Sequence, residues 1–271
     1  MEFIFFGATT VAADTLEQLI AKNMKPVAVV ANPTEPVGHK QTSTLPAVKL
    51  VADKNDIPVL QPESLTSAEF IDSLQKFNAD VFIVMTQGES IPENIITLPR
   101  MGTIGVHPSL LPAYRGPSPI QSAVFQGETV SGVTLYKMDT EVDHGPILAV
   151  QEFPIAVGAS AQSLEPLVAS VSAVLISNTI PAFLDGRITP KAQKEGLARN
   201  MTKKWLAADG EVDFKNDNPV YIYRKILALN PEPGVWTNNY PGYEGKKVKL
   251  LNCEMQNGAL KITEIQPDGK E

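Results

Sequence analysis

Short apolar runs alternate with helical patterns along much of this 271-residue chain, and that alternation constrains its fold more than any other feature. Phe3 to Phe6 form an apolar run, and residues 80–85 are apolar after Asp80; such runs are typical of strands buried on both faces. Between them, apolar side chains such as Leu16, Leu19 and Ile20 recur at helical spacing. This order of elements predicts an α/β fold, a Rossmann-like and mostly parallel sheet with helices on both faces.

The same pattern divides the chain into three parts. Residues 1–186 are predicted to form the α/β domain, residues 187–204 a basic linker, and residues 205–271 a small β-rich C-terminal domain. Thr9 or Thr10 is the expected cap of the first helix. In the first part, strands are also predicted at 27–30, 58–60, 103–106, 132–138 and 146–152, helices at 47–54, 67–76 and 161–184, a helix between Pro119 and Gly127, and a loop at 33–46.

Composition limits the partners and the compartment. The formal net charge is −7 and the pI is about 5.1, which weighs against broad nucleic-acid binding, because that depends on Lys and Arg neutralising phosphates. The single cysteine, Cys253, cannot form an internal disulfide or a multi-cysteine zinc site. The N-terminal residues lack the basic region of a signal peptide, and we find no apolar stretch long enough to span a bilayer. We therefore expect a cytoplasmic protein without a membrane partner.

The segment with the most chemical information is IGVHPSLLPAYRGPSPIQ at 104–121. His107 directly follows a predicted strand, and parallel sheets bind their ligands at the carboxyl ends of their strands. The prolines at 108, 112, 117 and 119 restrict the backbone of the next loop, which suits a rigid binding wall. The sequence therefore predicts a functional histidine beside a stiff loop.

Two other patterns bear on cofactors. The turn GATT at 7–10 lacks the three glycines of a dinucleotide-binding fingerprint, so the fold alone does not indicate NAD. Residues 138–145 place three acids, Asp139, Glu141 and Asp143, ahead of Gly145, as in a polar loop or an incomplete calcium loop. Because the full calcium-loop pattern is absent, we expect no metal.

Two long motifs carry a resemblance to a known family. SLLPAYRGPSPIQ at 109–121 and GVTLYKMDTEVDHGPIL at 132–148 match SLLPxxRGxxPIQ and GVTxxxMDxxxDxG, in the same order and at the same separation. Weaker similarity extends from FFGATTVAADTLEQLI near the start to ILALNPEPGVWT at 226–237, so the likeness covers nearly the whole chain. The chain resembles the folate-dependent formyltransferases, and most closely those that act on methionyl-tRNA.

The resemblance implies a reaction and the residues that carry it. A 10-formyltetrahydrofolate would donate its formyl group to a primary amine, here the amino group of initiator methionyl-tRNA, in translation initiation. The match places the catalytic histidine at His107 and, in a later loop, the aspartate that orients it and manages the proton at Asp143. It places the folate contacts at Ser109, Leu110, Leu111 and Pro112 and, along the backbone, at Gln87, Gly88 and Glu89.

Gly105 departs from the family pattern. The family has an asparagine two residues before the histidine, as a donor to the oxyanion of the tetrahedral intermediate, and this chain reads IGVH instead of INVH. Loss of one such donor typically lowers turnover by about 10²–10³-fold. Three interpretations stay open: Thr103, Gln87 or Ser109 substitutes for the donor; the enzyme is slow; or the chain is a folate- or tRNA-binding homologue with impaired catalysis.

The acceptor is the least constrained part of the resemblance. Arg115, His39 and Lys40 are the candidate acceptor-binding residues, although members that act on tRNA carry more basic side chains in the loop at 33–46. The family's C-terminal domain is β-barrel-like, and we expect a shortened OB-like version here. A formyltransferase acting on an amino sugar or another small amine is therefore an alternative. We expect a monomer in either case.

Overall fold

The computed structural model describes residues 1–37, 42–85, 90–194 and 201–269. By the density of its contacts the chain divides into two compact units, each built from segments that are distant in sequence. The domain boundaries at 186 and 204 that the sequence suggests stay a prediction. The first unit comprises Met1–Pro117, Gly132–Glu152 and Pro166–Met201, and the second comprises Ser118–Ser131, Phe153–Glu165 and Thr202–Glu271.

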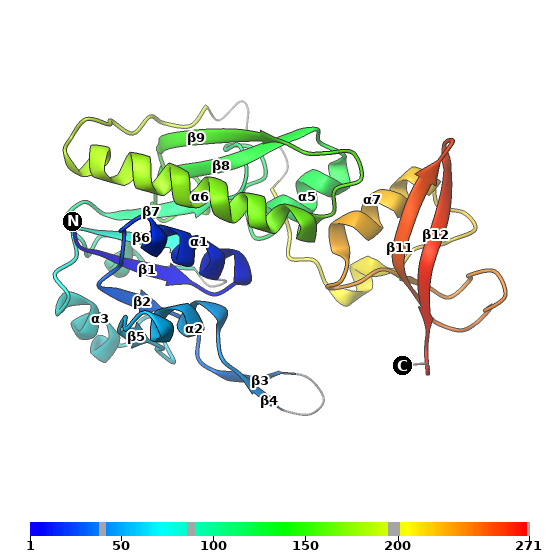
Figure 1. Ribbon diagram of the computed structural model, residues 1–271, viewed down its shortest axis with the longest axis horizontal. Coiled ribbons are helices and arrows are strands. Elements are labelled where there is room, and N and C mark those ends of the chain that lie inside the picture. Colours follow the sequence, from blue (N-terminus) through cyan, green and yellow to red (C-terminus); the bar gives the residue numbers. More distant parts are fainter. Residues whose placement is uncertain (38–41, 86–89, 195–200, 270–271) are drawn as a thin grey trace. The chain divides into compact units, whose positions relative to one another are not determined.

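A seven-stranded sheet runs through the first unit, in the order β5-β2-β1-β6-β7-β8-β9 (Figure 1). The pairs from β5 to β7 are parallel, and β7 pairs with β8 in the antiparallel direction. The expected mostly parallel sheet is confirmed. Its strands are β1 (Phe3–Gly7), β2 (Ala28–Val30), β5 (Val59–Leu60), β6 (Val81–Met85), β7 (Thr103–His107), β8 (Val130–Lys137) and β9 (Ile147–Pro154).

Helices cover both faces of this sheet because its central strands are apolar on both sides. Phe6 and Phe82 belong to a buried cluster that includes side chains of α3 and α4. Alternate residues such as Phe5 point to the other face, where Ala12 of α1 and Val48 of α2 also approach Gly7. The helices of this unit are α1 (Thr10–Ala21), α2 (Ala47–Lys54), α3 (Ala68–Gln75), α4 (Glu93–Ile96) and most of α6 (Ala161–Leu184).

Helix ends follow the signals in the sequence. The Thr9 side chain accepts a hydrogen bond from the Ala12 N–H at 3.4 Å, which caps α1 as predicted. Helix α5 (Pro119–Gln126) has proline at its first position, where the missing N–H costs no helical hydrogen bond. It ends at Gly127, whose φ of +75° favours glycine.

Helix α6 is long and apolar enough to cross a membrane by length and composition alone. The expectation that no stretch reaches that length is therefore wrong. Of its most apolar window, 44% is buried inside the structure, and the Thr15 hydroxyl of α1 lies 3.5 Å from the Ala169 carbonyl oxygen of α6. A helix that packs against neighbouring elements in a protein core is also apolar around much of its circumference, so it passes the same test of length and composition.

Two local predictions differ from the structure. The segment 33–46, expected to be a loop, contains two antiparallel strands, β3 (Glu35–Val37) and β4 (Thr42–Thr44). Helix α4 was not expected at all. The strands have three residues each and the helix four, which is too short for an apolar repeat to appear in the sequence.

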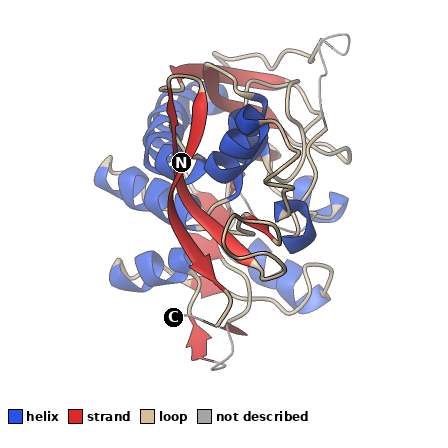
Figure 2. Ribbon diagram, turned by 90° about the vertical axis from the view of Figure 1, so that its right-hand side faces the viewer, coloured by secondary structure: helices blue, strands red, loops and turns tan. Residues whose placement is uncertain are grey.

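The second unit combines α5 and α7 with a three-stranded antiparallel sheet in the order β10-β11-β12. Figures 1 and 2 show β11 and β12 as a long hairpin. Ile222 and Leu229 of α7 share a buried cluster with Val248 and Cys253 of β11, and burial raises the pKa of the Cys253 thiol to about 11. These elements form the expected small β-rich region: α7 (Pro219–Leu229), β10 (Trp236–Thr237), β11 (Val248–Gln256) and β12 (Ala259–Pro267).

Candidate active site

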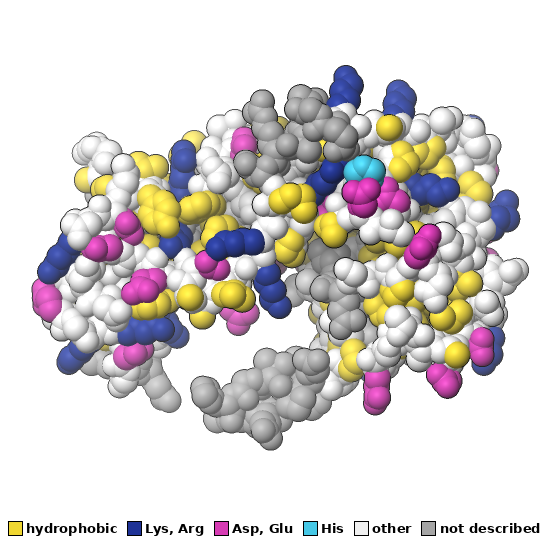
Figure 3. Space-filling view, turned by 180° about the vertical axis from the view of Figure 1, so that it is seen from behind, with side chains coloured by type: hydrophobic (Ala, Val, Ile, Leu, Met, Phe, Trp, Pro, Cys, Tyr) yellow, Lys and Arg dark blue, Asp and Glu magenta, His cyan; other side chains and the backbone are white. Residues whose placement is uncertain are grey.

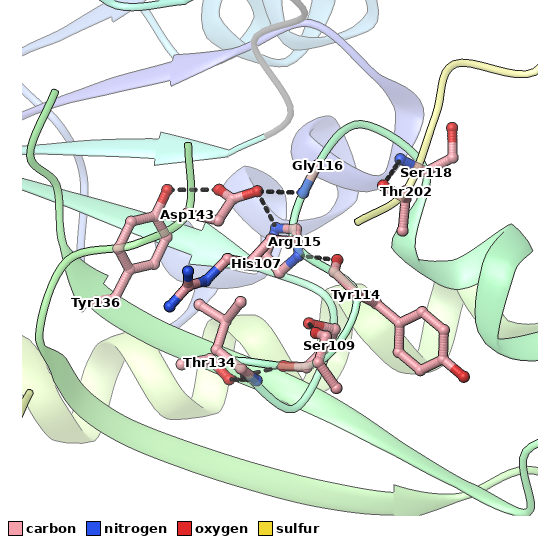
Figure 4. A network of polar contacts seen from close by, with 12 residues as sticks. His107, Ser109, Tyr114, Arg115, Gly116, Ser118, Thr134, Tyr136, Asp143 and Thr202 are labelled. Atoms are coloured by element: carbon pink, nitrogen blue, oxygen red, sulfur yellow. Dashed lines mark hydrogen bonds and ion pairs between the residues drawn. The ribbon is translucent and has the colours of Figure 1, made fainter. Parts of the chain in front are cut away.

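The candidate site lies at the carboxyl end of β7, whose last residue is His107. β7 pairs with β8 so that Gly105 is opposite Tyr136 and His107 is opposite Thr134. Side chains directly opposite each other in an antiparallel pair lie on the same face of the sheet, as do alternate residues of one strand. These four positions therefore share one face, and Figure 4 shows the three side chains gathered there.

The loop after His107 is fixed to β8 through Thr134. The Thr134 hydroxyl donates to the Ser109 carbonyl oxygen at 2.6 Å and accepts from the Leu111 N–H at 3.2 Å (Figure 4). Thr134 is fully buried, so these bonds are shielded from water. The segment from Ser109 to Pro112, predicted to contact folate, is thus a rigid wall next to the histidine.

The ring of His107 is buried and lies between two oxygen atoms. Its Nε2 lies 2.9 Å from the Tyr114 carbonyl oxygen, and its Nδ1 lies 3.5 Å from Oδ2 of Asp143 (Figure 4). The φ angles of Tyr114 and Asp143 are +60° and +50°, which is uncommon for residues other than glycine. Both loops thus adopt an unfavourable backbone conformation where they meet the histidine, a feature that clusters at functional sites.

Asp143 joins the loop between β8 and β9 to the rest of the site. Its Oδ2 accepts a hydrogen bond from the Gly116 N–H, and its Oδ1 accepts one from the Tyr136 hydroxyl, each at 2.7 Å. Burial, together with the Asp143 carboxylate, raises the pKa of Tyr136 well above its usual range, so the phenol stays protonated and donates. The structure therefore brings the two predicted catalytic residues, His107 and Asp143, together.

Gln193, which the sequence did not indicate, fastens the same loop. Its side-chain N–H groups donate to the carbonyl oxygens of Asp143 and Gly145, each at 2.9 Å. Its side-chain oxygen accepts from Nη2 of Arg115 at 2.7 Å and from Nε at 3.2 Å. Arg115 is 9% exposed, so part of its guanidinium supports the loop from inside. Its role in binding the acceptor stays a prediction.

Tyr136 occupies the space that a side chain at position 105 would need. A Cβ on Gly105 would lie 2.3 Å from Cε1 of Tyr136 and 2.7 Å from its hydroxyl oxygen, closer than real Cβ atoms approach. The hydroxyls of Thr103 and Ser109, two substitutes considered from the sequence, donate to backbone carbonyl oxygens at 2.9 Å and 2.7 Å. Among the described residues, the Tyr136 phenol occupies the space where a side chain at position 105 would lie.

The remaining predicted site residues cannot be placed in this geometry. Gln87, Gly88, Glu89, His39 and Lys40 lie outside the described residues. Within the described ranges, no group of three or more His, Cys, Asp or Glu side chains could hold a metal ion.

Replacing Gly105 by alanine is expected to lower the free energy of unfolding by about 1–3 kcal/mol, the usual cost of overpacking a buried site. The added methyl group would collide with the buried ring of Tyr136. Urea denaturation measures the loss. In a Tyr136→Ala background the ring is gone, so adding Gly105→Ala should cost much less; an equal cost in both backgrounds would contradict this account.

His144 follows Asp143 in sequence but belongs to a surface cluster. Its side chain is 35% exposed, with Nδ1 2.8 Å from Oδ2 of Asp139 and 3.9 Å from Oε1 of Glu141. Figure 3 shows a histidine at the surface beside acidic side chains. His107, the other described histidine, is buried.

Replacing Asp139 by asparagine is expected to lower the pKa of His144, because the hydrogen bond to Asp139 is the main cause that raises it above 6.5. A raised pKa in the folded state stabilises the fold fully below the unfolded-state pKa, and this contribution disappears as the pH rises through the folded-state pKa. An NMR titration of the imidazole measures the shift. An unchanged pKa of His144 in the variant would show that the hydrogen bond to Asp139 is not what raises it.

The chain is similar to known proteins over most of its length. A family model described as "Formyl transferase" matches residues 1–180, and one described as "Formyl transferase, C-terminal domain" matches residues 205–269. The methionyl-tRNA formyltransferase of Chloroflexus aurantiacus is 35% identical over 237 residues, which are 88% of this chain and 76% of that protein. The methionyl-tRNA formyltransferase of Geobacter sulfurreducens is 32% identical over 273 residues, covering 100% of this chain and 84% of that protein.

A solved structure shares the fold. HypX from Aquifex aeolicus in complex with tetrahydrofolic acid superposes with a TM-score of 0.69 at 21% identity, covering 94% of this chain and 38% of that protein. At this identity the likeness shows the fold alone. The two family models and the two relatives together show that the chain belongs to the formyl transferase family, whose members are enzymes that transfer formyl groups.

Proposed function

We propose that this chain transfers the formyl group of 10-formyltetrahydrofolate to the amino group of initiator methionyl-tRNA. The observation that carries the proposal is the His107–Asp143 contact at the end of β7, in a chain whose relatives bear that activity in their names. The tetrahydrofolic acid in HypX, a structural neighbour, supports a folate donor.

The reaction forms one bond and breaks one. The amine nitrogen attacks the formyl carbon, a carbon–nitrogen bond forms, and the carbonyl electrons move to oxygen. The nitrogen gives up a proton, the tetrahedral intermediate collapses, and the bond from the formyl carbon to the folate nitrogen breaks. That folate nitrogen takes up a proton, so the products are formylmethionyl-tRNA and tetrahydrofolate. The enzyme must therefore accept one proton, return one, and stabilise an oxyanion.

His107 and Asp143 can divide these tasks. The Nε2–H group of His107 donates to the developing oxyanion. The oxyanion thereby displaces the Tyr114 carbonyl oxygen, which is the partner of Nε2 in the free protein. Hydrogen bonds of catalytic groups commonly rearrange when substrate binds. Asp143 accepts the proton of the amine through its carboxylate, each of whose oxygens can accept more than one hydrogen bond. Its bonds to Gly116 and Tyr136 hold it beside His107 during the reaction.

The folate donor is proposed to lie against the segment Ser109, Leu110, Leu111 and Pro112. Thr134 satisfies backbone groups of this segment, so it keeps its shape without a ligand. Leu110 and Pro112 are half-buried and offer apolar surface at its edge. A rigid wall of this kind lowers the ordering cost of binding. Gln87, Gly88 and Glu89 are proposed to complete the site.

We propose a tRNA acceptor although the chain carries a formal net charge of −7. Residues 205–271 contain eight Lys and Arg against ten Asp and Glu, so this region carries no excess of positive charge. The basic side chains are concentrated at 187–204, with six Lys and Arg against one Glu. We propose that this segment, with Arg115, His39 and Lys40, contacts the acceptor. We also propose a cytoplasmic monomer.

A formyl-transfer assay that compares acceptors tests the proposal. Purified protein with 10-formyltetrahydrofolate is offered charged initiator tRNA or free amino sugars, over a series of salt concentrations. We expect transfer to the tRNA, with a KM for tRNA that rises steeply with salt because phosphate contacts release counterions. Transfer to amino sugars alone would establish the small-amine alternative instead. Folate binding without transfer to any acceptor would indicate a binding homologue.

A further inference from the structure

Gly105 and Tyr136 form a reciprocal pair across β7 and β8. They are directly opposite in the strand register, and the Tyr136 ring fills the volume above the glycine. The phenol oxygen lies 2.7 Å from the place where a Cβ at 105 would stand. The polar end of Tyr136 thus lies where this chain lacks the side chain that the family pattern expects.

We propose that Tyr136 is a positioning residue, whose hydroxyl takes over the place left by Gly105 and orients the Asp143 carboxylate toward His107. This inference rests on the proposed function and names a residue at a position that the family pattern GVTxxxMDxxxDxG leaves variable.

Two hydrogen bonds fix the plane of the Asp143 carboxylate. The Tyr136 hydroxyl holds Oδ1 and the Gly116 N–H holds Oδ2, each at 2.7 Å, and Oδ2 then lies 3.5 Å from Nδ1 of His107 (Figure 4). Without the hydroxyl, only one of these two bonds would remain, and rotation about the side-chain torsion would move Oδ2 away from the ring. Tyr136 is buried, so loss of its hydroxyl would leave Oδ1 of Asp143 without a water molecule to donate in its place.

The pair also decides which variants are informative. Gly105→Asn alone does not test a missing donor, because any side chain at 105 collides with the Tyr136 ring. The collision would expel the phenol from Asp143 while adding the amide, so one donor is exchanged for another. An informative test changes both positions, and it also changes the hydroxyl without the ring.

Tyr136→Phe removes the hydroxyl and keeps the ring. We expect kcat to fall by about 10–100-fold, less than the 10²–10³-fold typical of losing a donor to the reacting oxygen. The KM for the folate donor should stay within about twofold, because in this account Tyr136 acts only through Asp143. Tyr240→Phe, which removes a hydroxyl in the second unit, is the matched control. An unchanged kcat in Tyr136→Phe would overturn the inference.

Rescue separates positioning from a structural role. Tyr136→Met should lose activity, and Gly105→Asn in the Tyr136→Met background should restore about 10-fold or more of kcat, because the space is then open for an amide N–H that donates to Oδ1 of Asp143 in place of the phenol. Loss of activity that the second substitution does not recover would contradict the reciprocal pair.

A readout without turnover keeps this test separate from the proposed function. The nitrogen resonances of His107 are expected to move in Tyr136→Phe and to stay in place in Tyr240→Phe. If the wild-type protein transfers no formyl group, the proposed function fails, and this spectrum still tests the role of Tyr136. Unmoved His107 resonances would overturn the inference.

Discussion

Replacing His107 by glutamine is expected to lower kcat by about 10²–10³-fold, the range typical of losing a positioned donor to the developing oxyanion. The ring is buried and meets Tyr114 and Asp143 through its two nitrogens, so its orientation is fixed before substrate arrives. A glutamine amide can donate a hydrogen bond, but its N–H and its oxygen do not stand where the two ring nitrogens of His107 stand, so it cannot donate to the oxyanion and keep the contact with Asp143 at the same time.

Steady-state formyl transfer measures this loss, and folate binding by fluorescence titration is the control. Because the loop from Ser109 to Pro112 is held by Thr134 and not by the histidine, the affinity for folate should change little. A kcat within tenfold of the wild-type value would contradict the role of His107. A loss of folate binding alone would assign the residue to binding instead.

The second large effect is expected for Asp143→Asn, with a fall in kcat of about 10²-fold or more. An asparagine has nearly the same shape, but one of its two terminal groups donates instead of accepting. In either orientation its NH2 group would face a donor, the Tyr136 hydroxyl on one side or the Gly116 N–H on the other. A buried donor left without an acceptor lowers the free energy of unfolding, so the variant should also be less stable.

Asp139→Asn is the matched control for Asp143→Asn, since both residues lie in the same loop and Asp139 contacts His144 at the surface. We expect it to leave kcat within a factor of two of the wild-type value and to change only the titration of His144. Equal losses of kcat in the two variants would mean that the charge of the loop matters, and not the contact with His107.

The framework could be predicted because each central strand is apolar on both faces. Phe3 to Phe6 and residues 81–85 became β1 and β6, and the helix expected at 161–184 is α6 with the same bounds. The hairpin of β3 and β4 was missed, because three-residue strands show no repeat. A long apolar helix that packs inside an α/β unit also looks like a membrane span when only length and composition are considered.

The site was predictable only in part. His107 follows a strand of a parallel sheet, where ligands bind, and the family motifs supplied Asp143. Tyr136 was missed because its role depends on strand register, which pairs it with Gly105 and which the sequence does not reveal. Gln193 was missed because it lies 50 residues from Asp143 in sequence and a single glutamine carries no motif.

The central claim is that this site moves a formyl group from folate to the amine of methionyl-tRNA. A single-turnover experiment with label in the formyl group of 10-formyltetrahydrofolate tests it most directly. The account predicts that wild-type protein carries the label to charged initiator tRNA and that Asp143→Asn does so at least about 10²-fold more slowly. Label that stays on the folate with wild-type protein, while folate binds normally, would contradict the account.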